Sequence, residues 1–280
     1  MEKKKDTIAQ WTESAPYWEK HRAVVREMFA PVSEALIADA HIAKGQTVLD
    51  VAMGPGEPAL TLADAVGRDG KVVGTDAIAE MVEAARREAA RRGLQNARFE
   101  TAVGEKLPFA DNSFDAAVCR FGVMFFPSPV GGVREILRVL KPGGRIALAV
   151  WHFVERNAFF TAVTNVVDRY VPPTPPEPDA PDAFRFAKPG ALLEVFASAG
   201  VKAASERLLK FSIRAKATPE EFWTLRSELS ESMRAKLARL SEAKLAELKR
   251  EVIQGIKAYS SGEGVSFPSE VLIVSGEKAG

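Results

Sequence analysis

VLDVAMGPGEPAL, residues 48–60, is the stretch that decides the fold. It opens with apolar residues typical of a short strand, and Gly54 and Gly56 follow where such a strand would turn into a helix. A strand that runs through a glycine turn into a helix is typical of doubly wound α/β sheets, whose ligands lie at the carboxyl ends of the strands. Gly54, Gly56 and Ala59 also satisfy the G-x-G-x-x-A spacing of dinucleotide-binding loops. The stretch therefore predicts a ligand-binding turn. The class of ligand has to be inferred from the residues beside the glycines.

From residue 45 to residue 151 the sequence alternates between strand and helix patterns. Short apolar runs lie at 47–51, 71–75, 97–101, 114–119 and 145–151. Between them, residues 78–92 and 133–140 have apolar positions at helical spacing. This order predicts an α/β fold with a mostly parallel sheet covered by helices on both faces.

The rest of the chain is predicted to surround that core as one domain, residues 1–280. Residues 7–42 are helical in pattern, six of the twelve residues in 171–182 are proline, and Thr218-Pro219-Glu220-Glu221 is a capping box that opens a helical stretch to about residue 259. A helix over 188–200 and strands over 206–214 and 269–277 complete the pattern. We expect N-terminal lid helices in 1–44, a cofactor-binding core in 45–151, a proline-rich linker and return to the sheet in 152–216, a helical lid insertion in 217–262 and the last strand in 263–280.

The composition narrows the class of protein. The formal net charge is +1, so electrostatics give no reason to expect nucleic acid or an anionic membrane as the main partner. Cys119 is the one cysteine and there are three histidines, so we expect neither an internal disulfide nor a metal site. No run approaches the length of a membrane span, and we expect a cytoplasmic protein, monomeric or homodimeric.

The residues between the glycines favour a ligand that is cationic and carries no phosphate. Pro55 and Pro58 lack the N–H groups that a pyrophosphate needs, and Glu57 adds a negative charge. At a few ångströms, repulsion between that charge and a phosphate is of order a few kcal/mol. S-adenosylmethionine (SAM) fits instead, because its sulfonium and its ammonium are positive, and Asp50 could receive the ammonium. Asp76, which ends the second strand, can accept the ribose hydroxyls of SAM and of NAD alike.

Four stretches in this order resemble the class I SAM-dependent methyltransferases. They are VLDVAMGPGEPAL (48–60), VVGTDAIAEMVEAAR (72–86), AVGEKLPFADNSFDAAVCRFGVMFFP (102–127) and EILRVLKPGGRIALAVW (135–151). More narrowly, they resemble the type 11 group, which includes the menaquinone/ubiquinone C-methyltransferases. The resemblance implies a Rossmann-like, doubly wound sheet of seven strands, mostly parallel, with the last strand antiparallel.

The resemblance also implies which residues bind the cofactor. Asp50, Ala52, Gly54 and Gly56 would hold the methionine part, Asp76 the ribose, and Ala77 and Met81 would flank the adenine, with Gly104 and Glu105 at its edge and Arg120 and Phe121 closing over the methionine end. The chain departs from the family pattern at three positions, where Ala52 replaces a glycine, Met53 a cysteine and Val103 an aspartate. These departures bear on the contacts with the cofactor more than on its identity.

The acceptor is predicted to be a small, apolar or aromatic metabolite. Residues 119–127 read CRFGVMFFP, an apolar wall without the acid or amide and Pro-Pro-aromatic motif of many amine methyltransferases. Phe125 and Trp18 are the candidate substrate-binding residues. His152 and Tyr17 are the candidate catalytic residues, although in-line transfer from a sulfonium needs a base only if the acceptor must lose a proton. A hydrogen-bonded structural role is the alternative for His152.

Two other functions remain open at this level. The glycine spacing and Asp76 also allow an NAD(P)-dependent oxidoreductase. A third possibility is a SAM-binding protein that transfers nothing.

Overall fold

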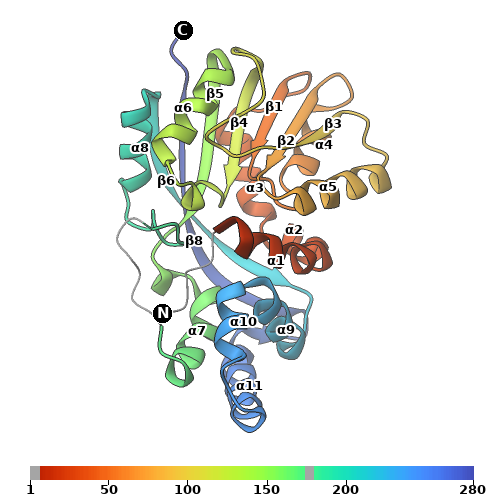
Figure 1. The fold of residues 1–280 in the computed structure, drawn as a ribbon, viewed down its shortest axis with the longest axis vertical. Coiled ribbons are helices and arrows are strands. Elements are labelled where there is room, and N and C mark those ends of the chain that lie inside the picture. Colours follow the sequence, from red (N-terminus) through yellow and green to blue (C-terminus); the bar gives the residue numbers. More distant parts are fainter. Residues whose placement is uncertain (1–6, 174–179) are drawn as a thin grey trace.

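The computed structural model describes residues 7–173 and 180–280. The predicted proline-rich segment 171–182 therefore lies partly outside the described residues. Figure 1 shows a sheet with helices on both sides, and a helical lobe below the ends of its strands.

The sheet has the topology that the sequence predicts. Its strand order is β3-β2-β1-β4-β5-β8-β6, with β7 paired to β8 off this path. The first five are parallel, and β8 runs antiparallel to both β5 and β6. The strands are β1 (Thr47–Val51), β2 (Lys71–Asp76), β3 (Ala97–Thr101), β4 (Phe114–Arg120), β5 (Leu140–Trp151), β6 (Lys202–Ala215), β7 (Ser260–Ser261) and β8 (Gly264–Glu277). The predicted fold class is confirmed; the two-residue β7 was not predicted.

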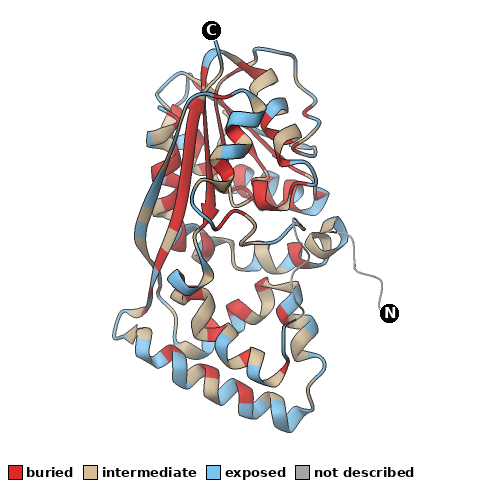
Figure 2. Ribbon diagram, turned by 90° about the vertical axis from the view of Figure 1, so that its left-hand side faces the viewer, coloured by how far each residue is buried: buried red, intermediate tan, exposed pale blue. Residues whose placement is uncertain are grey.

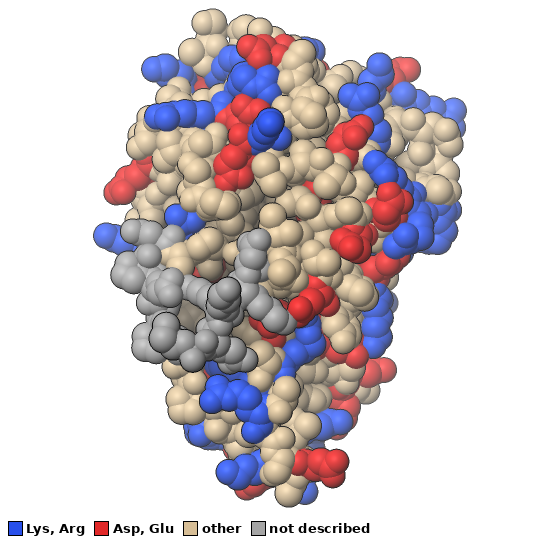
Figure 3. All heavy atoms as spheres, in the orientation of Figure 1, with Lys and Arg blue, Asp and Glu red and all other residues tan. Residues whose placement is uncertain are grey.

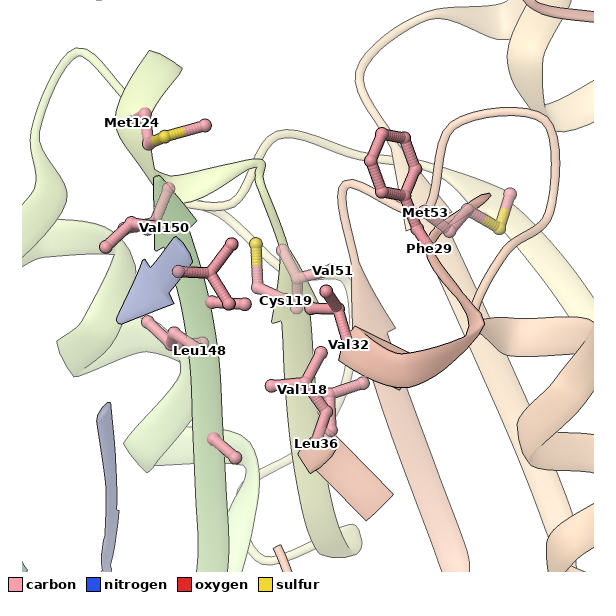
Figure 4. Close-up of a cluster of buried hydrophobic side chains, with 14 of the residues drawn as sticks. Phe29, Val32, Leu36, Val51, Met53, Val118, Cys119, Met124, Leu148 and Val150 are labelled. Carbon is pink, nitrogen blue, oxygen red and sulfur yellow. The ribbon is translucent and has the colours of Figure 1, made fainter. Parts of the chain in front are cut away.

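Helices cover both faces of the sheet, as the connections between parallel strands require. One face carries α3 (Ala30–Asp39), α4 (Ala59–Val66) and α5 (Ala79–Arg92), and the other carries α6 (Pro129–Val139) and α8 (Ala191–Ala199). Buried residues follow the strands and the inner sides of these helices (Figure 2). Figure 4 shows Val32 and Leu36 of α3 beside Val118 of β4, in a cluster of fully buried side chains.

The helical lobe lies beyond the carboxyl ends of the parallel strands (Figure 1). It consists of α7 (Ala158–Tyr170), α9 (Pro219–Leu229), α10 (Glu231–Leu237) and α11 (Glu242–Ile256). The predicted capping box is present, since the Thr218 hydroxyl accepts from the amide of Glu221 and the Glu221 carboxylate accepts from the amide of Thr218. The stretch from 218 to 259, expected as helical, is divided because Ser230 and Ser241 each cap a new helix.

The N-terminal helices α1 (Thr7–Lys20) and α2 (Arg22–Met28) lie between the sheet and the lobe (Figure 1). Helix α1 contacts α5 on the sheet side and both α9 and α10 on the lobe side. It is therefore placed where a helix can close over the strand ends.

Acidic and basic side chains are mixed over the face shown in Figure 3, without a broad patch of one sign. Among the described residues, no helix is long and apolar enough to cross a membrane. The part of the chain that the structure describes also holds no group of histidine, cysteine and carboxylate side chains that could bind a metal.

Candidate active site

The sheet register brings three charged side chains to one face at the carboxyl ends of neighbouring strands. Asp50 of β1 pairs with Gly74 of β2 and with Val118 of β4. Residues paired across a sheet point to the same face, and so do residues two positions apart along a strand. Asp50, Asp76 and Arg120 therefore share the face that ends at the predicted ligand-binding turn.

The turn itself approaches its neighbours closely. Ala52 and Gly54 have left-handed backbone angles, with φ of 57° and 59°. Gly56 has φ of 113°, and a Cβ there would lie 2.7 Å from Cδ1 of Leu60. Gly122, just after β4, faces Ala52, and a Cβ at Gly122 would lie 2.4 Å from the Cβ of Ala52. Ala52 can thus replace the family glycine, since a glycine stands opposite.

Asp76 joins the turn to the next helix. Its Oδ2 accepts from the amide of Gly54 at 2.9 Å, and its Oδ1 accepts from the amide of Ile78 at 2.9 Å. Burial raises the pKa of Asp76 to about 6, although these backbone amides act in the opposite direction. The bond to Ile78 fixes the turn just before α5 and is not a side-chain cap of that helix. Each carboxylate oxygen has a second lone pair for a ligand.

Asp50 is the least satisfied side chain at this edge of the sheet. It is fully buried, and neither carboxylate oxygen accepts a hydrogen bond of normal geometry from another described residue. Burial raises its pKa well above the ordinary value, while the charge of Arg120 and the backbone amide of Ala59 at the start of α4 act in the opposite direction. A buried carboxylate without a partner is costly, so the site favours a cationic group near Asp50.

Arg120 is held beneath the turn. Its guanidinium donates to the Ser33 hydroxyl at 2.8 Å and to the Glu57 carbonyl at 3.0 Å. It also lies over the ring of Phe29, 5.7 Å from the ring centroid. These contacts brace the turn against α3, and they were not predicted.

Glu57 differs from its interpretation in the sequence. Its buried carboxylate accepts from the Thr61 hydroxyl at 2.6 Å and pairs with Arg92 at 3.1 Å and Arg26 at 3.3 Å. Its charge is therefore compensated by two arginines, and the argument that Glu57 repels a phosphate is wrong. The preference for a cation must rest on Asp50.

Helix α1 covers the predicted adenine side. Ala15 of α1 packs with Ile78 and Met81, and Trp18 and Ala77 pack against the same cluster. The indole N–H of Trp18 donates to the Leu229 carbonyl at 3.2 Å, which ties α1 to the end of α9. Ala77 and Met81 are thus together beneath α1.

Gly104 and Glu105 lie beside the start of α6. A Cβ at Gly104 would lie 2.4 Å from Cζ of Phe126, and Oε1 of Glu105 accepts from the Ser128 amide at 3.0 Å. One oxygen of Glu105 is therefore engaged by the backbone. Phe126 is buried there.

An aromatic cluster continues from the end of β4 toward the lobe. Phe121, which has φ of 63°, stacks on Trp151 with ring centroids 4.3 Å apart and an angle of 1° between the planes. Trp151 in turn contacts Phe159 at 6.2 Å and Phe160 at 4.9 Å. Nearer α1, Phe125 packs edge-on against Trp11 at 5.2 Å. Phe125 and Trp18, the predicted substrate-binding residues, both lie next to Trp11, since Trp18 is 5.7 Å from it.

The two predicted catalytic residues lie apart from this cluster. The Tyr17 ring faces the lobe, where the Arg234 guanidinium lies 4.7 Å from its centroid. His152 follows β5, and its Nδ1 lies 3.0 Å from Oε2 of Glu270. Trp151 pairs with Val271, so His152 and Glu270 are on the opposite face from Trp151.

Sequence reasoning missed one buried charge near the aromatic cluster. Arg226 of α9 is 6% exposed, and its guanidinium lies 4.2 Å from the centroid of Phe159 and 4.9 Å from that of Phe160. The sequence does indicate that this arginine is buried, because Arg226 lies four residues after Phe222 and three before Leu229, on the apolar stripe of the helix.

The geometry agrees with comparisons to known proteins. The family model described as a methyltransferase domain matches residues 48–144. The uncharacterized methyltransferase YcgJ of Bacillus subtilis is 37% identical over 127 residues, which are 45% of this chain and 49% of YcgJ. A demethylmenaquinone methyltransferase of Geobacillus stearothermophilus is 38% identical over 104 residues, 37% of this chain and 44% of that protein. The chain thus spans about half the length of the curated relatives it matches.

The likeness of fold extends further than the likeness of sequence. The crystal structure of YcgJ superimposes with a TM-score of 0.57 at 21% identity, covering 90% of this chain and 99% of that one. Residues 48–144 match a methyltransferase domain, and the resemblance of this chain to the SAM-dependent methyltransferases is confirmed.

Proposed function

We propose that the protein is a methyltransferase that transfers the methyl group of SAM to a small, apolar or aromatic metabolite by in-line displacement. The observation that carries the proposal is Asp50, a fully buried carboxylate whose two oxygens accept no hydrogen bond of normal geometry within the described part of the chain. The ammonium of SAM would supply the missing positive charge without bringing a phosphate to this site.

The neighbouring groups fit the rest of the cofactor. Asp76 has lone pairs left for the two ribose hydroxyls after accepting from Gly54 and Ile78. The left-handed backbone at Ala52 and Gly54 keeps the turn open to a ligand lying along it. Ala77 and Met81 offer an apolar floor for a base, and α1 covers them.

When bound, SAM would supply an electrophilic methyl group, and the protein would have to position the acceptor and exclude water. The aromatic side chains at the strand ends support that role. Phe121 and Trp151 form one stacked pair of rings, and Trp11 of α1 forms a second pair with Phe125. The relative named demethylmenaquinone methyltransferase supports an aromatic, quinone-like acceptor.

A base is needed only for an acceptor that loses its proton early. His152 and Tyr17 are the candidates that the sequence supplies. Glu270 holds Nδ1 of His152, so Nε2 would have to accept the proton. The Tyr17 ring packs under Arg234, away from Phe121 and Trp151. The positions of His152 and Tyr17 support a general base less strongly than the position of Asp50 supports SAM binding.

Two measurements on the full chain test the proposal. Calorimetry should detect binding of S-adenosylhomocysteine and no heat with NADH; the reverse would favour an oxidoreductase. Incubation with methyl-labelled SAM and a panel of phenols, quinones and amines should then transfer label to at least one acceptor. Binding of S-adenosylhomocysteine with no transfer to any member of the panel would favour a SAM-binding protein without transferase activity.

A further inference from the structure

The buried guanidinium of Arg226 has no electrostatic partner in the described part of the chain. No hydrogen bond or ion pair joins it to another described residue, and its Nε is buried without a partner. Other arginines near the strand ends differ. Arg92 pairs with two carboxylates, and Arg120 donates to a hydroxyl and a carbonyl.

Burial of this charge is costly to the protein. Desolvation lowers the pKa of Arg226 to about 10, and no carboxylate of the described residues acts against it. The rings of Phe159 and Phe160 recover part of this cost through cation–π contacts. Such contacts engage the face of the guanidinium and supply no acceptor for its N–H groups, of which the Nε donor is buried without a partner among the described residues.

Three carboxylates of the surrounding helices have other partners. Glu228, two residues along α9, pairs with Lys20 and with His21. In the rest of the lobe, Asp168 pairs with Lys236, and Glu251 binds Arg169 and Tyr170. None of these carboxylates pairs with Arg226.

Arg226 stands at the lobe end of the aromatic cluster that starts beside the cofactor turn. Phe121 follows β4 and stacks on Trp151, Trp151 contacts Phe160, and Phe160 lies under Arg226. Three successive contacts thus connect Phe121, which is predicted to close over the methionine end of SAM, with the guanidinium. Helix α9, which carries Arg226, also contacts α1, the helix that covers the cofactor side.

We infer that Arg226 binds a carboxylate on the methyl acceptor, so that the substrate is an aromatic acid rather than a neutral aromatic compound. This inference rests on the proposed function, because it places the acceptor between the cofactor turn and α9. The planar guanidinium can donate two parallel hydrogen bonds to a carboxylate, and the aromatic rings beside it suit the hydrocarbon part. Arg226 would then set specificity without taking part in the chemistry.

The test uses the full chain saturated with S-adenosylhomocysteine. Benzoate, 2-naphthoate and anthraquinone-2-carboxylate are titrated by calorimetry, each against its primary amide, which has the same shape without the charge. We expect at least one acid to bind about tenfold or more tightly than its amide, the ratio typical of charge-assisted hydrogen bonds. Arg226→Gln should abolish this ratio, and Arg226→Lys should retain part of it.

Arg169→Gln is the matched control, because Arg169 is an exposed arginine of the same lobe with a carboxylate partner. It should leave the ratio of acid to amide unchanged. Equal binding of every acid and its amide, absence of binding across the series, or a ratio that survives in Arg226→Gln would overturn the inference. Failure of the wild-type chain to bind S-adenosylhomocysteine would instead contradict the proposed function, so the two failures are distinguishable. Circular dichroism of each variant checks that it is folded.

Discussion

Oδ2 of Asp76 accepts a hydrogen bond from the amide of Gly54 at 2.9 Å, so the end of β2 holds the turn that follows β1. The other oxygen, Oδ1, accepts from Ile78 at the start of α5. One carboxylate therefore fixes both sides of the proposed cofactor site. Its raised pKa, about 6, makes this site sensitive to pH.

Asp76→Asn should weaken binding of S-adenosylhomocysteine by about tenfold or more at pH 7, since hydrogen bonds to a charged group contribute about 1.5–3 kcal/mol. In the wild type, ligand hydroxyls favour the ionised carboxylate, so affinity should fall as the pH drops below about 6. The variant should lose that part of the pH dependence. Calorimetry between pH 5 and pH 8 measures both effects.

Asp76 affects the stability of the unliganded fold with the opposite dependence on pH. The folded protein without ligand favours protonated Asp76, because burial raises its pKa from 3.8 to about 6. This group therefore contributes stability that is complete below pH 3.8 and is lost as the pH rises through about 6.

Asp115→Asn is the control for the binding experiment on Asp76→Asn. Asp115 lies at the other end of the strands, where it accepts hydrogen bonds from Lys141 and from the amide of Thr47. Equal loss of affinity in both variants would contradict a direct role for Asp76.

The contact between Ala52 and Gly122 predicts a double-mutant effect. Gly122→Ala would place its methyl 2.4 Å from the Cβ of Ala52 and 2.8 Å from Sγ of Cys119. We expect a loss of about 1–3 kcal/mol in the free energy of unfolding, as in other overpacked sites. Ala52→Gly in the same chain should recover part of it. Urea unfolding of the two single variants and the double variant measures the coupling, and strict additivity would contradict the proposed clash.

Much of the fold was predictable because it rests on local patterns. The strand over 47–51 needs only a short apolar run, and the helix over 79–92 needs helical spacing and the glycine after it. The order of these elements then limits the sheet to a few topologies. The division of 218–259 into three helices could also be read afterwards from Ser230 and Ser241, whose hydroxyls cap helices.

The partners of charged residues were not predictable, because they come from distant parts of the chain. Glu57 looked like a free charge in the turn, yet Arg26 and Arg92 neutralise it from α2 and α5. Arg226 looked like one more charge on a solvated helix, since nothing in the sequence shows that Phe159 and Phe160 cover it. Residue type and spacing locate the site, whereas its electrostatics depend on contacts made only in the fold.

The ion pairs of Glu88 lead us to predict that the protein loses stability in acid. Glu88 is 3% exposed and accepts from Arg91, Arg92 and Arg22, the last of which joins α2 to α5. The hydrogen bond from Arg91 is the largest of the effects that lower its pKa to about 2. A carboxylate with a lowered pKa stabilises the fold above its ordinary pKa of 4.5, and that stability is lost as the pH falls toward 2.

Glu88→Gln should therefore cost about 2–3 kcal/mol at pH 7 and much less at pH 3, given about 1.4 kcal/mol per unit of pKa shift. Urea unfolding at both values measures this. Glu83→Gln is the control on the same helix, since the Glu83 side chain is 53% exposed and pairs only with Arg86 among the described residues. A Glu88 variant with the same loss at pH 3 as at pH 7 would show that packing, not charge, explains the effect.

A substitution at His152 distinguishes a catalytic role of this residue from a structural one. Its Nδ1 lies 3.0 Å from Glu270, and Asn157 holds both strands of this corner by donating to the His152 carbonyl and accepting from the Glu270 amide. This pair lies on the face opposite Trp151, so we expect His152 to stabilise the corner rather than to accept a proton. His152→Gln should lower the melting temperature while single-turnover methyl transfer stays within about threefold of the wild type. A general base contributes about 10²–10⁴-fold, so a loss of that size, with a pH–rate profile that loses its acidic limb, would identify His152 as the base. Tyr17→Phe, measured in the same way, tests the other candidate, and we expect its rate to change little because the ring contacts Arg234 and the substitution keeps the ring.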